Sequence, residues 1–472
     1  MKLLAVPDFR NSFYDGIFAH VFATLTGGVF LTGFALHLGM SDFMIGILAA
    51  LPFVVTIFQL PTSRLIQKNG TRKKVAYVSS WVSRGLWVPV LGFGLLPFSD
   101  DTVKHTTVLG LIFLSHAFAT VGYIAWLSWT SDLVPCDIRG RFFGTRNMLC
   151  GAAGIGATIL FGNFLDFSKS QALGPSFGFT ITFSSAVIFG LMSLRFLRRV
   201  SEVPISPSRD DISFRRNLAL PFKDANFRRF LVFMSMWNCA VYLASPFFTL
   251  YFLRDLQFSY GFVAALAMVS ALADLLGMHV WGKVSDKVKN KVVIRIASWV
   301  VVFLPLAWAT VRPGSLVIPI LLHLMGGAFW AGINLCTNNL LLAVSPQKTR
   351  PLYISAYNII GGLGAVLGPV VAGLALESFD GHQFNVFSRN LVPLQVVFFA
   401  STLLRFLSLW MLRYVHEPDE VSIGQMVRII RSVRGLNTAN GYNQLLHPTI
   451  EVPKNPMKRP GPHHVEQEQG GP

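Results

Sequence analysis

The sequence predicts an all-α integral membrane protein with about twelve transmembrane helices in two pseudo-symmetric bundles of six. The first observation is composition: 52% of the 472 residues are hydrophobic and 13% are charged, whereas a soluble globular protein carries about 25% charged residues. The second is a series of apolar runs of about 20 residues, the length a helix needs to cross the hydrocarbon core. These runs recur to roughly residue 415, and one long polar connection, residues 199–228, separates the first six from the last six.

The expected spans follow one another closely. Because the outer loops are short, consecutive helices should be antiparallel neighbours. The spans cover residues 14–38, 42–66, 75–98, 106–133, 146–167, 176–196, 229–253, 258–281, 292–311, 315–343, 354–377 and 392–414.

The distribution of Lys and Arg predicts the orientation. With both termini in the cytoplasm, most of the 40 basic residues fall on cytoplasmic segments, as the positive-inside rule requires. The few on outer loops are Lys104, Lys169, Arg254, Arg312 and Arg389. The net charge of +17 does not indicate nucleic-acid binding, because the basic residues lie between apolar runs rather than on one solvated face. We expect a multi-pass protein of the plasma (inner) membrane.

The chain divides into an N-terminal bundle, a cytoplasmic central loop, a C-terminal bundle and a cytoplasmic tail. These segments are residues 1–198, 199–228, 229–416 and 417–472. The tail begins with apolar residues at helical spacing and arginines between them, which predicts a basic amphipathic helix on the inner leaflet. The apolar residues are Ile423, Met426, Val427, Ile430 and Val433. The end of the tail should be disordered.

Cofactor, metal and catalytic sites are not expected. The four cysteines lie in or beside apolar runs, with neither a CxxC pair nor zinc-ligand spacing. Glycines inside apolar spans allow close helix approach, whereas a phosphate-binding glycine loop must follow a strand and open a helix. No arrangement of nucleophile, base and oxyanion donors is recognisable, so the protein should not be an enzyme.

The two halves contain a sequence repeat. Residues 135–162 and 346–373 match at a constant shift, and a second stretch relates the first span to the seventh. The matched pairs are Pro135/Pro346, Arg139/Arg350, Asn147/Asn358, Gly151/Gly362, Gly162/Gly373, Asp166/Glu377, His20/Asn238 and Ser41/Ser259. Parallel repeats are one plan that transporters use, with the solute site between the halves near the bilayer midplane.

The chain resembles the major facilitator superfamily in three motifs. The loop after span eight keeps Gly282 and Asp286 of the family pattern G-x-x-x-D-x-x-G-R/K-R/K, and the loop after span two keeps Gly70 and Arg72. Span eleven is similar to the family's glycine-proline signature, with Gly364, Gly368 and Pro369. Asp132 and Arg139 match the sugar-porter pattern once, but Ala343 stands opposite Arg350 in the second half, so we do not predict a sugar porter.

Polar side chains at helical spacing predict the faces that line a cavity. A polar stripe in lipid is costly and should face water or a ligand, and the family resemblance implies that spans one, four, seven and ten surround the central cavity. Hydrogen bonding between helices is the alternative. The candidate cavity residues are His20, Thr24, His116, Tyr123, Trp126, Asn238, Tyr242, Ser245, His323, Trp330, Asn334 and Asn338.

Two further sets of residues are candidates for coupling and gating. Asp274 is the deepest acid within a span, and burial favours its neutral form, so it is a candidate proton carrier together with His20. Arg84 and Arg405 lie in spans that the family fold makes peripheral, where snorkelling or a helix–helix salt bridge is expected. Asp286 should latch onto the start of span five. The gating candidates are Asp286, Gly282, Gly70, Arg72, Asp132, Arg139, Arg141, Arg350, Gly364, Gly368 and Pro369.

These features predict a secondary active transporter that moves a small solute by alternating access, driven by a proton or solute gradient as a symporter or antiporter. Proton-driven efflux of amphipathic compounds, suggested by Trp126 and Trp330, and uptake of a polar nutrient remain open within this class. A non-transporting receptor or sensor is the alternative from another class. We expect a monomer in the lipid bilayer whose partners are a small-molecule solute and protons.

Overall fold

The structure is a computed structural model that describes most of residues 5–417. It leaves out residues 60, 64–65, 67–70, 96–99, 172–173, 204–218, 380–383 and 387–388, as well as both ends of the chain. Gly70, half of the central loop and the predicted amphipathic helix of the tail therefore lie outside the described residues.

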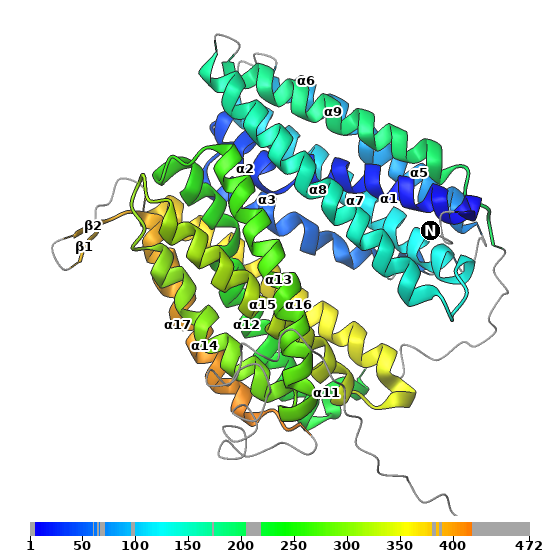
Figure 1. The fold of residues 1–472 in the computed structure, drawn as a ribbon. Helices are drawn as coiled ribbons and strands as arrows, with labels where there is room; N and C mark the ends of the chain where they lie inside the picture. Colours follow the sequence, from blue (N-terminus) through cyan, green and yellow to red (C-terminus); the bar gives the residue numbers. More distant parts are fainter. Residues whose placement is uncertain are drawn as a thin grey trace, which may run out of the picture. The chain divides into compact units, whose positions relative to one another are not determined.

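The first half of the chain is helical (Figure 1). α1 packs against α8 and α9, and α7 packs against α5 and α6. The elements are α1 (Pro7–Leu25), α2 (Gly28–His37), α3 (Asp42–Val54), the 3₁₀ turn η2 (Val55–Phe58), α5 (Arg72–Gly85), α6 (Trp87–Leu95), α7 (Asp101–Leu133), α8 (Arg139–Ser170) and α9 (Gly174–Leu197).

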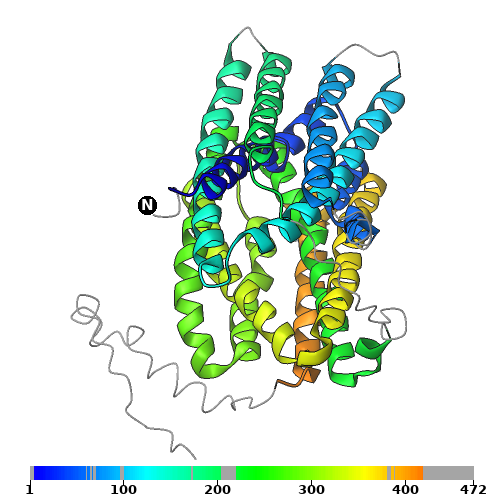
Figure 2. The ribbon, with the colours of Figure 1, turned by 90° about the vertical axis from the view of Figure 1, so that its right-hand side faces the viewer.

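The second half repeats this plan. α12 lies against α16 and α17, and α13 lies against α15 and α14 (Figures 1 and 2). The elements are α11 (Leu220–Lys223), α12 (Ala225–Leu250), the π-helical turn η3 (Tyr251–Asp255), α13 (Tyr260–Val288), α14 (Asn290–Trp308), α15 (Val317–Ala343), the 3₁₀ turn η4 (Gln347–Thr349), α16 (Arg350–Ser378), α17 (Pro393–Met411) and the 3₁₀ turn η5 (Leu412–Tyr414).

Eleven helical stretches within the described residues are long and apolar enough to cross a membrane. The remaining predicted span, residues 75–98, corresponds to α5 and α6, which meet at Leu86. These helices have 14 and 9 residues, so each alone is shorter than the about 20 residues of a spanning helix. Together they occupy the place of the third span, and the predicted polytopic all-α architecture is confirmed.

Helix ends differ from the predicted spans because an apolar run marks the part of a helix in lipid, whereas a cap marks where the helix begins. α7 begins at Asp101, five residues before the predicted span, because Asp100 Oδ1 accepts the N–H groups of Thr102 (2.8 Å) and Val103 (3.3 Å). Such capping fixes where a helix starts, whereas the apolar run marks only the lipid-embedded part.

A short β-hairpin between α16 and α17 was not predicted. β1 (Phe384–Val386) pairs antiparallel with β2 (Arg389–Leu391), and Phe384 stands opposite Leu391. Strands of three residues are too short to show the alternating pattern by which strands are found in a sequence.

The repeat appears in the structure as matched contacts. Ser41 Oγ accepts the N–H of Met44 at the start of α3, and Ser259 Oγ accepts the N–H of Phe262 at the start of α13. Similarly, Arg139 Nη2 donates to the carbonyl eight residues earlier (2.6 Å), and Arg350 Nη2 does the same (3.5 Å). Each of these two arginines ties the start of one long helix to the end of the helix before it.

The two halves contact each other closely where α3 and α13 begin and α8 and α16 end, which we call the joined end. There α3 packs on α16, and α8 packs on α13. A Cβ on Gly373 would lie 2.8 Å from the Cα of Phe43, and one on Gly162 would lie 3.4 Å from the Cα of Gly261. Because these glycines have no side chain, the backbones of the two halves touch.

Polar contacts hold the joined end on both sides. The carboxylate of Asp166, on α8, accepts the N–H groups of Tyr260 (2.8 Å) and Gly261 (2.7 Å) at the start of α13. A carboxylate at a helix N-terminus satisfies unpaired N–H groups and interacts favourably with the helix dipole. On the other side, Arg254 Nη1 lies 2.7 Å from Asp42 Oδ1.

The opposite end lacks the predicted latch in this conformation. Asp286 is exposed, and among the described residues it forms no ion pair with Arg139 or Arg141. The latch stays a prediction for a conformation in which the starts of α8 and α16 approach the other half.

Replacing Asp166 with Ala should weaken the joined end. Losing a helix cap costs about 0.5–2 kcal/mol, which moves the equilibrium about 2- to 30-fold toward conformations with this end open. Spin labels at Lys169 and Gln257, both exposed, in a cysteine-free background should show longer distances. Glu377→Ala, at the repeat-related position, is the control. Equal distance distributions for the two variants would contradict the claim that Asp166 holds the joined end closed by capping α13.

Replacing Gly162 with Val should also separate the end of α8 from the start of α13, since a Cβ at this position would lie 3.1 Å from the carbonyl oxygen of Tyr260. The same spin-label pair measures the change. Gly156→Val, on the same helix, has open space at its Cβ position and should leave the distance unchanged. If both valine variants behave alike, backbone contact at Gly162 does not control closure.

Candidate functional site

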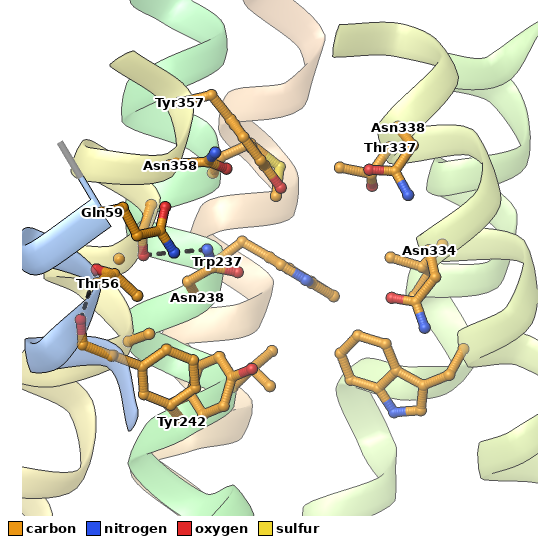
Figure 3. A pocket seen from close by; sticks show the side chains of 18 residues that line it. Thr56, Gln59, Trp237, Asn238, Tyr242, Asn334, Thr337, Asn338, Tyr357 and Asn358 are labelled. Atoms are coloured by element: carbon orange, nitrogen blue, oxygen red, sulfur yellow. Dashed lines mark hydrogen bonds between the residues drawn. The ribbon is translucent and has the colours of Figure 1, made fainter. Parts of the chain in front are cut away.

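A cavity of about 420 Å³ lies where α12, α15 and α16 face the segment formed by α3 and η2 (Figure 3). Side chains from both halves of the chain line it. They are Phe53, Thr56, Gln59, Met234, Trp237, Asn238, Val241, Tyr242, Trp330, Ile333, Asn334, Thr337, Asn338, Tyr357, Asn358, Gly361, Gly362 and Ala365. We call it the amide cavity, because five of these residues carry carboxamides.

The chemistry of the amide cavity is polar and uncharged. The described residues of its lining include no Asp, Glu, Lys, Arg or His. Each carboxamide offers two N–H donors and a carbonyl acceptor, and each hydroxyl can donate or accept. In Figure 3, Asn334, Thr337 and Asn338 of α15 face Trp237 and Asn238 of α12 across the cavity. The arrangement can therefore hydrogen-bond neutral polar groups from opposite sides.

Close packing of α12 and α16 fixes one wall of the amide cavity. A Cβ on Gly364 would overlap the carbonyl oxygen of Ser235, and one on Gly368 would lie 2.6 Å from that of Cys239. Asn238 Nδ2 donates to the carbonyl of Gly361 at 3.1 Å, across the same interface. The predicted gating glycines thus bring the two backbones together and orient Asn238.

Aromatic side chains complete the walls. Phe53, from the first half, lies edge-on to Tyr242, from the second, with ring centroids 4.5 Å apart. Trp237 and Trp330 lie across α12 and α15 with ring centroids 6.1 Å apart. Aromatic faces are suited to the apolar faces of a flat or cyclic solute.

Five of the twelve predicted cavity residues meet in the amide cavity: Asn238, Tyr242, Trp330, Asn334 and Asn338. Ser245 and His323 line an adjoining cavity of about 290 Å³, which shares Val241 and Trp330 with the first.

The other predicted residues belong to the first half. Tyr123 and Trp126 stack with ring centroids 6.0 Å apart and line a separate cavity of about 270 Å³. His20 and Thr24 pack on Gly154 of α8, where a Cβ would lie 2.8 Å from the His20 ring. His116 is half-buried on α7 and lies outside the linings of these three cavities.

The sequence did not indicate that spans two and eleven would contribute to the amide cavity. Thr56 and Gln59 follow α3, and Tyr357 and Asn358 lie on α16. The repeat pair Asn147/Asn358 had singled out Asn358, but only as a marker of the repeat. The signal in the sequence that could have placed Asn358 in the cavity was its polar side chain within the apolar span eleven.

A buried charged cluster in the first half was also missed. Asp15 is 3% exposed, its Oδ1 accepts the hydroxyl of Ser193 (2.8 Å), and its Oδ2 lies 3.9 Å from Arg146 Nη2. Arg84, 6% exposed, lines the same 270 Å³ cavity, and its Nη1 has no hydrogen-bond partner. The guanidinium of Arg146 also lies 4.2 Å from the centroid of the Trp126 ring. These residues come from different helices, so nothing in their spacing indicated that they meet.

The candidate proton carrier Asp274 is half-buried on α13. It belongs to none of the three cavity linings, and no hydrogen bond or ion pair to it is found among the described residues. Its role stays a prediction.

The gating candidates fall into two groups. Arg72 is buried, pairs with Asp132, and donates to the carbonyls of Ser128 and Val203, both at 2.9 Å. It thereby joins the start of α5 to the end of α7. In the second half, a Cβ on Gly282 would lie 3.8 Å from the Leu335 side chain, an ordinary contact distance. Pro369 meets Gly46 at the joined end.

Known transporter structures share this fold. The nucleoside transporter NupG superimposes with a TM-score of 0.65 at 14% identity, covering 87% of this chain and 99% of that chain. A bacterial homologue of the iron transporter ferroportin, in an inward-facing state, gives 0.66 at 12% identity, covering 87% and 98%. The D-xylose–proton symporter gives 0.61 at 16%, covering 88% and 99%. Identities this low show the shared fold and no more.

Sequence comparison assigns the family. No curated protein sequence matches this chain, but the profile of the Major Facilitator Superfamily matches residues 16–369 and 229–449. The predicted fold and the prediction of a secondary transporter rather than an enzyme are confirmed, and the chain belongs to the Major Facilitator Superfamily.

Proposed function

We propose that this protein carries a small, polar solute with a flat or cyclic part across the membrane, and that it binds this solute in the amide cavity. The observation that carries the proposal is the lining itself: five carboxamides, four hydroxyl groups and several aromatic rings, contributed by both halves. A solute held by both halves is coupled to their relative movement, which alternating access requires.

The lining favours polar solutes over amphipathic cations. An unpaired cation is costly to take out of water, and among the described residues neither the amide cavity nor the adjoining 290 Å³ cavity is lined by Asp or Glu. A cation would have only the aromatic rings as partners there. Hydroxyl and amide groups of a solute would instead pair with Asn and Gln side chains. Two of the structural neighbours are described as transporters of nucleosides and of xylose, and solutes of that polarity suit this lining.

The two halves, residues 1–198 and 229–416, act in this proposal as the two moving bundles. With both termini in the cytoplasm of a bacterial-type plasma membrane, α3 and α13 begin on the outer side. The contacts of Asp166 and Gly373 would then close the outer side, and the structure would represent an inward-facing state. Outward opening requires these contacts to break and the starts of α8 and α16 to close.

The solute is found by screening the purified protein for thermal stabilisation, since a ligand stabilises the state that it binds. The panel contains sugars, nucleosides and amphipathic cations. Stabilisation by neutral polar solutes supports the proposal, and stabilisation by cations alone would refute it. Flux of the stabilising solute into proteoliposomes then separates a transporter from a receptor, which would bind without flux.

Replacing Asn358 with Leu should weaken binding of the stabilising solute roughly 2- to 10-fold, because one hydrogen bond contributes about 0.5–1.5 kcal/mol. The dissociation constant is measured by titration calorimetry. Asn147→Leu, the repeat-related substitution on α8, lies outside the amide cavity and should keep the wild-type constant. Equal losses in both variants would point away from the amide cavity.

Proton coupling is the finer part of the proposal, with Asp274 as the candidate carrier and His20 as the second. Asp274→Asn should abolish uptake driven by an imposed proton gradient but preserve exchange of solute across the membrane, because exchange needs no net proton movement. Asp137→Asn, an exposed acid, is the matched control. Gradient-driven uptake at the wild-type rate in Asp274→Asn would exclude this role.

A further inference from the structure

Beside the amide cavity lies a buried cation without a counter-ion. Arg405, on α17, is 3% exposed and lines the 290 Å³ cavity together with Ser245, Thr249, Ser270 and His323. Among the described residues no carboxylate pairs with it. A guanidinium stays protonated under all physiological conditions, so a full positive charge lies at this cavity within the membrane-spanning part of the protein.

Part of the Arg405 side chain has a structural role. Pro305 lacks an N–H group, so the carbonyl of Val301, four residues earlier on α14, has no donor within its helix. Arg405 Nη1 donates to that carbonyl at 3.0 Å. This bond satisfies a neutral acceptor but does not compensate the charge, and the buried Nε of Arg405 has no hydrogen-bond partner.

The lining around Arg405 can complete an anion site. Three hydroxyl-bearing side chains, Ser245, Thr249 and Ser270, line the same cavity as Arg405, and His323 Nδ1 lies 3.1 Å from the carbonyl of Pro319. Since that carbonyl requires the proton on Nδ1, Nε2 of a neutral His323 ring is an acceptor. The donors beside Arg405 are therefore the three hydroxyl groups, and His323 would add a donor to an anion only when its ring is charged. The remaining lining is apolar and largely aromatic, including Trp308, whose ring centroid lies 5.2 Å from that of His323.

We propose that Arg405 binds a carboxylate of the transported solute, so that the solute is an organic acid whose neutral polar part occupies the amide cavity. The two cavities share Val241 and Trp330, so they adjoin, and the proposal places one molecule across both. An uncompensated buried charge is costly, and a carboxylate offers Arg405 a charge-assisted hydrogen bond. This inference rests on the proposed function and adds the charge of the substrate.

The test compares carboxylates with neutral partners of similar shape, namely benzoate with benzamide and glucuronate with glucose, by thermal stabilisation of the full-length protein. At least one carboxylate should stabilise the wild type more than its partner does. Arg405→Gln should weaken binding of that carboxylate roughly 10- to 100-fold, as expected for loss of a hydrogen bond to a charged group. Binding of the neutral partner should stay unchanged. Arg405→Lys, which keeps the charge, should retain part of the preference.

Arg413→Gln is the matched control, because Arg413 lies in η5, two residues beyond the end of α17, is exposed, and stacks on Trp410. It should keep the full preference for the carboxylate. The proposal is overturned if neither carboxylate stabilises the wild type more than its neutral partner, or if Arg405→Gln keeps the preference. A response to laurate alone would assign the site to a lipid carboxylate and also overturn it.

Flux measurements separate this inference from the proposed function. If the wild type and Arg405→Gln transport a neutral solute at equal rates, the result supports solute binding in the amide cavity. It refutes the proposal that Arg405 binds a carboxylate of the solute. Arg405-dependent binding of a carboxylate without flux supports the anion site but refutes transport.

Discussion

The close backbone contact of α16 with two other helices is the constraint on which cavity and closure both depend. Gly364 and Gly368 bring α16 against α12, whereas Pro369 and Gly373 bring the next turns against α3. Because packed interiors resist continuous deformation, α16 transmits a shift at one contact to the other. Opening of the joined end therefore displaces the helix that carries Tyr357 and Asn358 in the amide cavity. The proposed solute site and the contact at the joined end therefore share one helix, α16.

Three buried arginines show how differently the fold compensates positive charge. Among the described residues, Arg72 has Asp132 and two carbonyl groups as partners, Arg84 shares a cavity with Asp15, and Arg405 has a single carbonyl group. The first arrangement is a structural tie between helices. Arg405 leaves a net positive charge at the 290 Å³ cavity. In the proposal, this charge is what makes the protein prefer an acid to a neutral solute.

Much of the fold could be predicted because the bilayer imposes a length and a polarity on every span. The repeat added tertiary information: one shift pairs Gly162 with Gly373, and the second shift, which pairs Ser41 with Ser259, also pairs the contacts of these glycines, Phe43 and Gly261. The amide cavity was found in part, since Asn238, Asn334 and Asn338 stand out as polar residues on otherwise apolar helices. The Asp15–Arg146 pair and the position of Gln59 could not be predicted, because they depend on which helices become neighbours and how they are rotated.

The cap that Asp166 places on α13 has a consequence for how this protein tolerates sequence change. The carboxylate binds the main-chain N–H groups of Tyr260 and Gly261 rather than their side chains. Substitutions at residue 260 can therefore keep these two hydrogen bonds. Residue 261 must remain small, because a side chain there would meet Asn163 and Asp166. These two hydrogen bonds would leave little trace as correlated substitutions between α8 and α13, whereas the edge-on packing of the Tyr260 ring on Phe179 of the first half depends on both side chains.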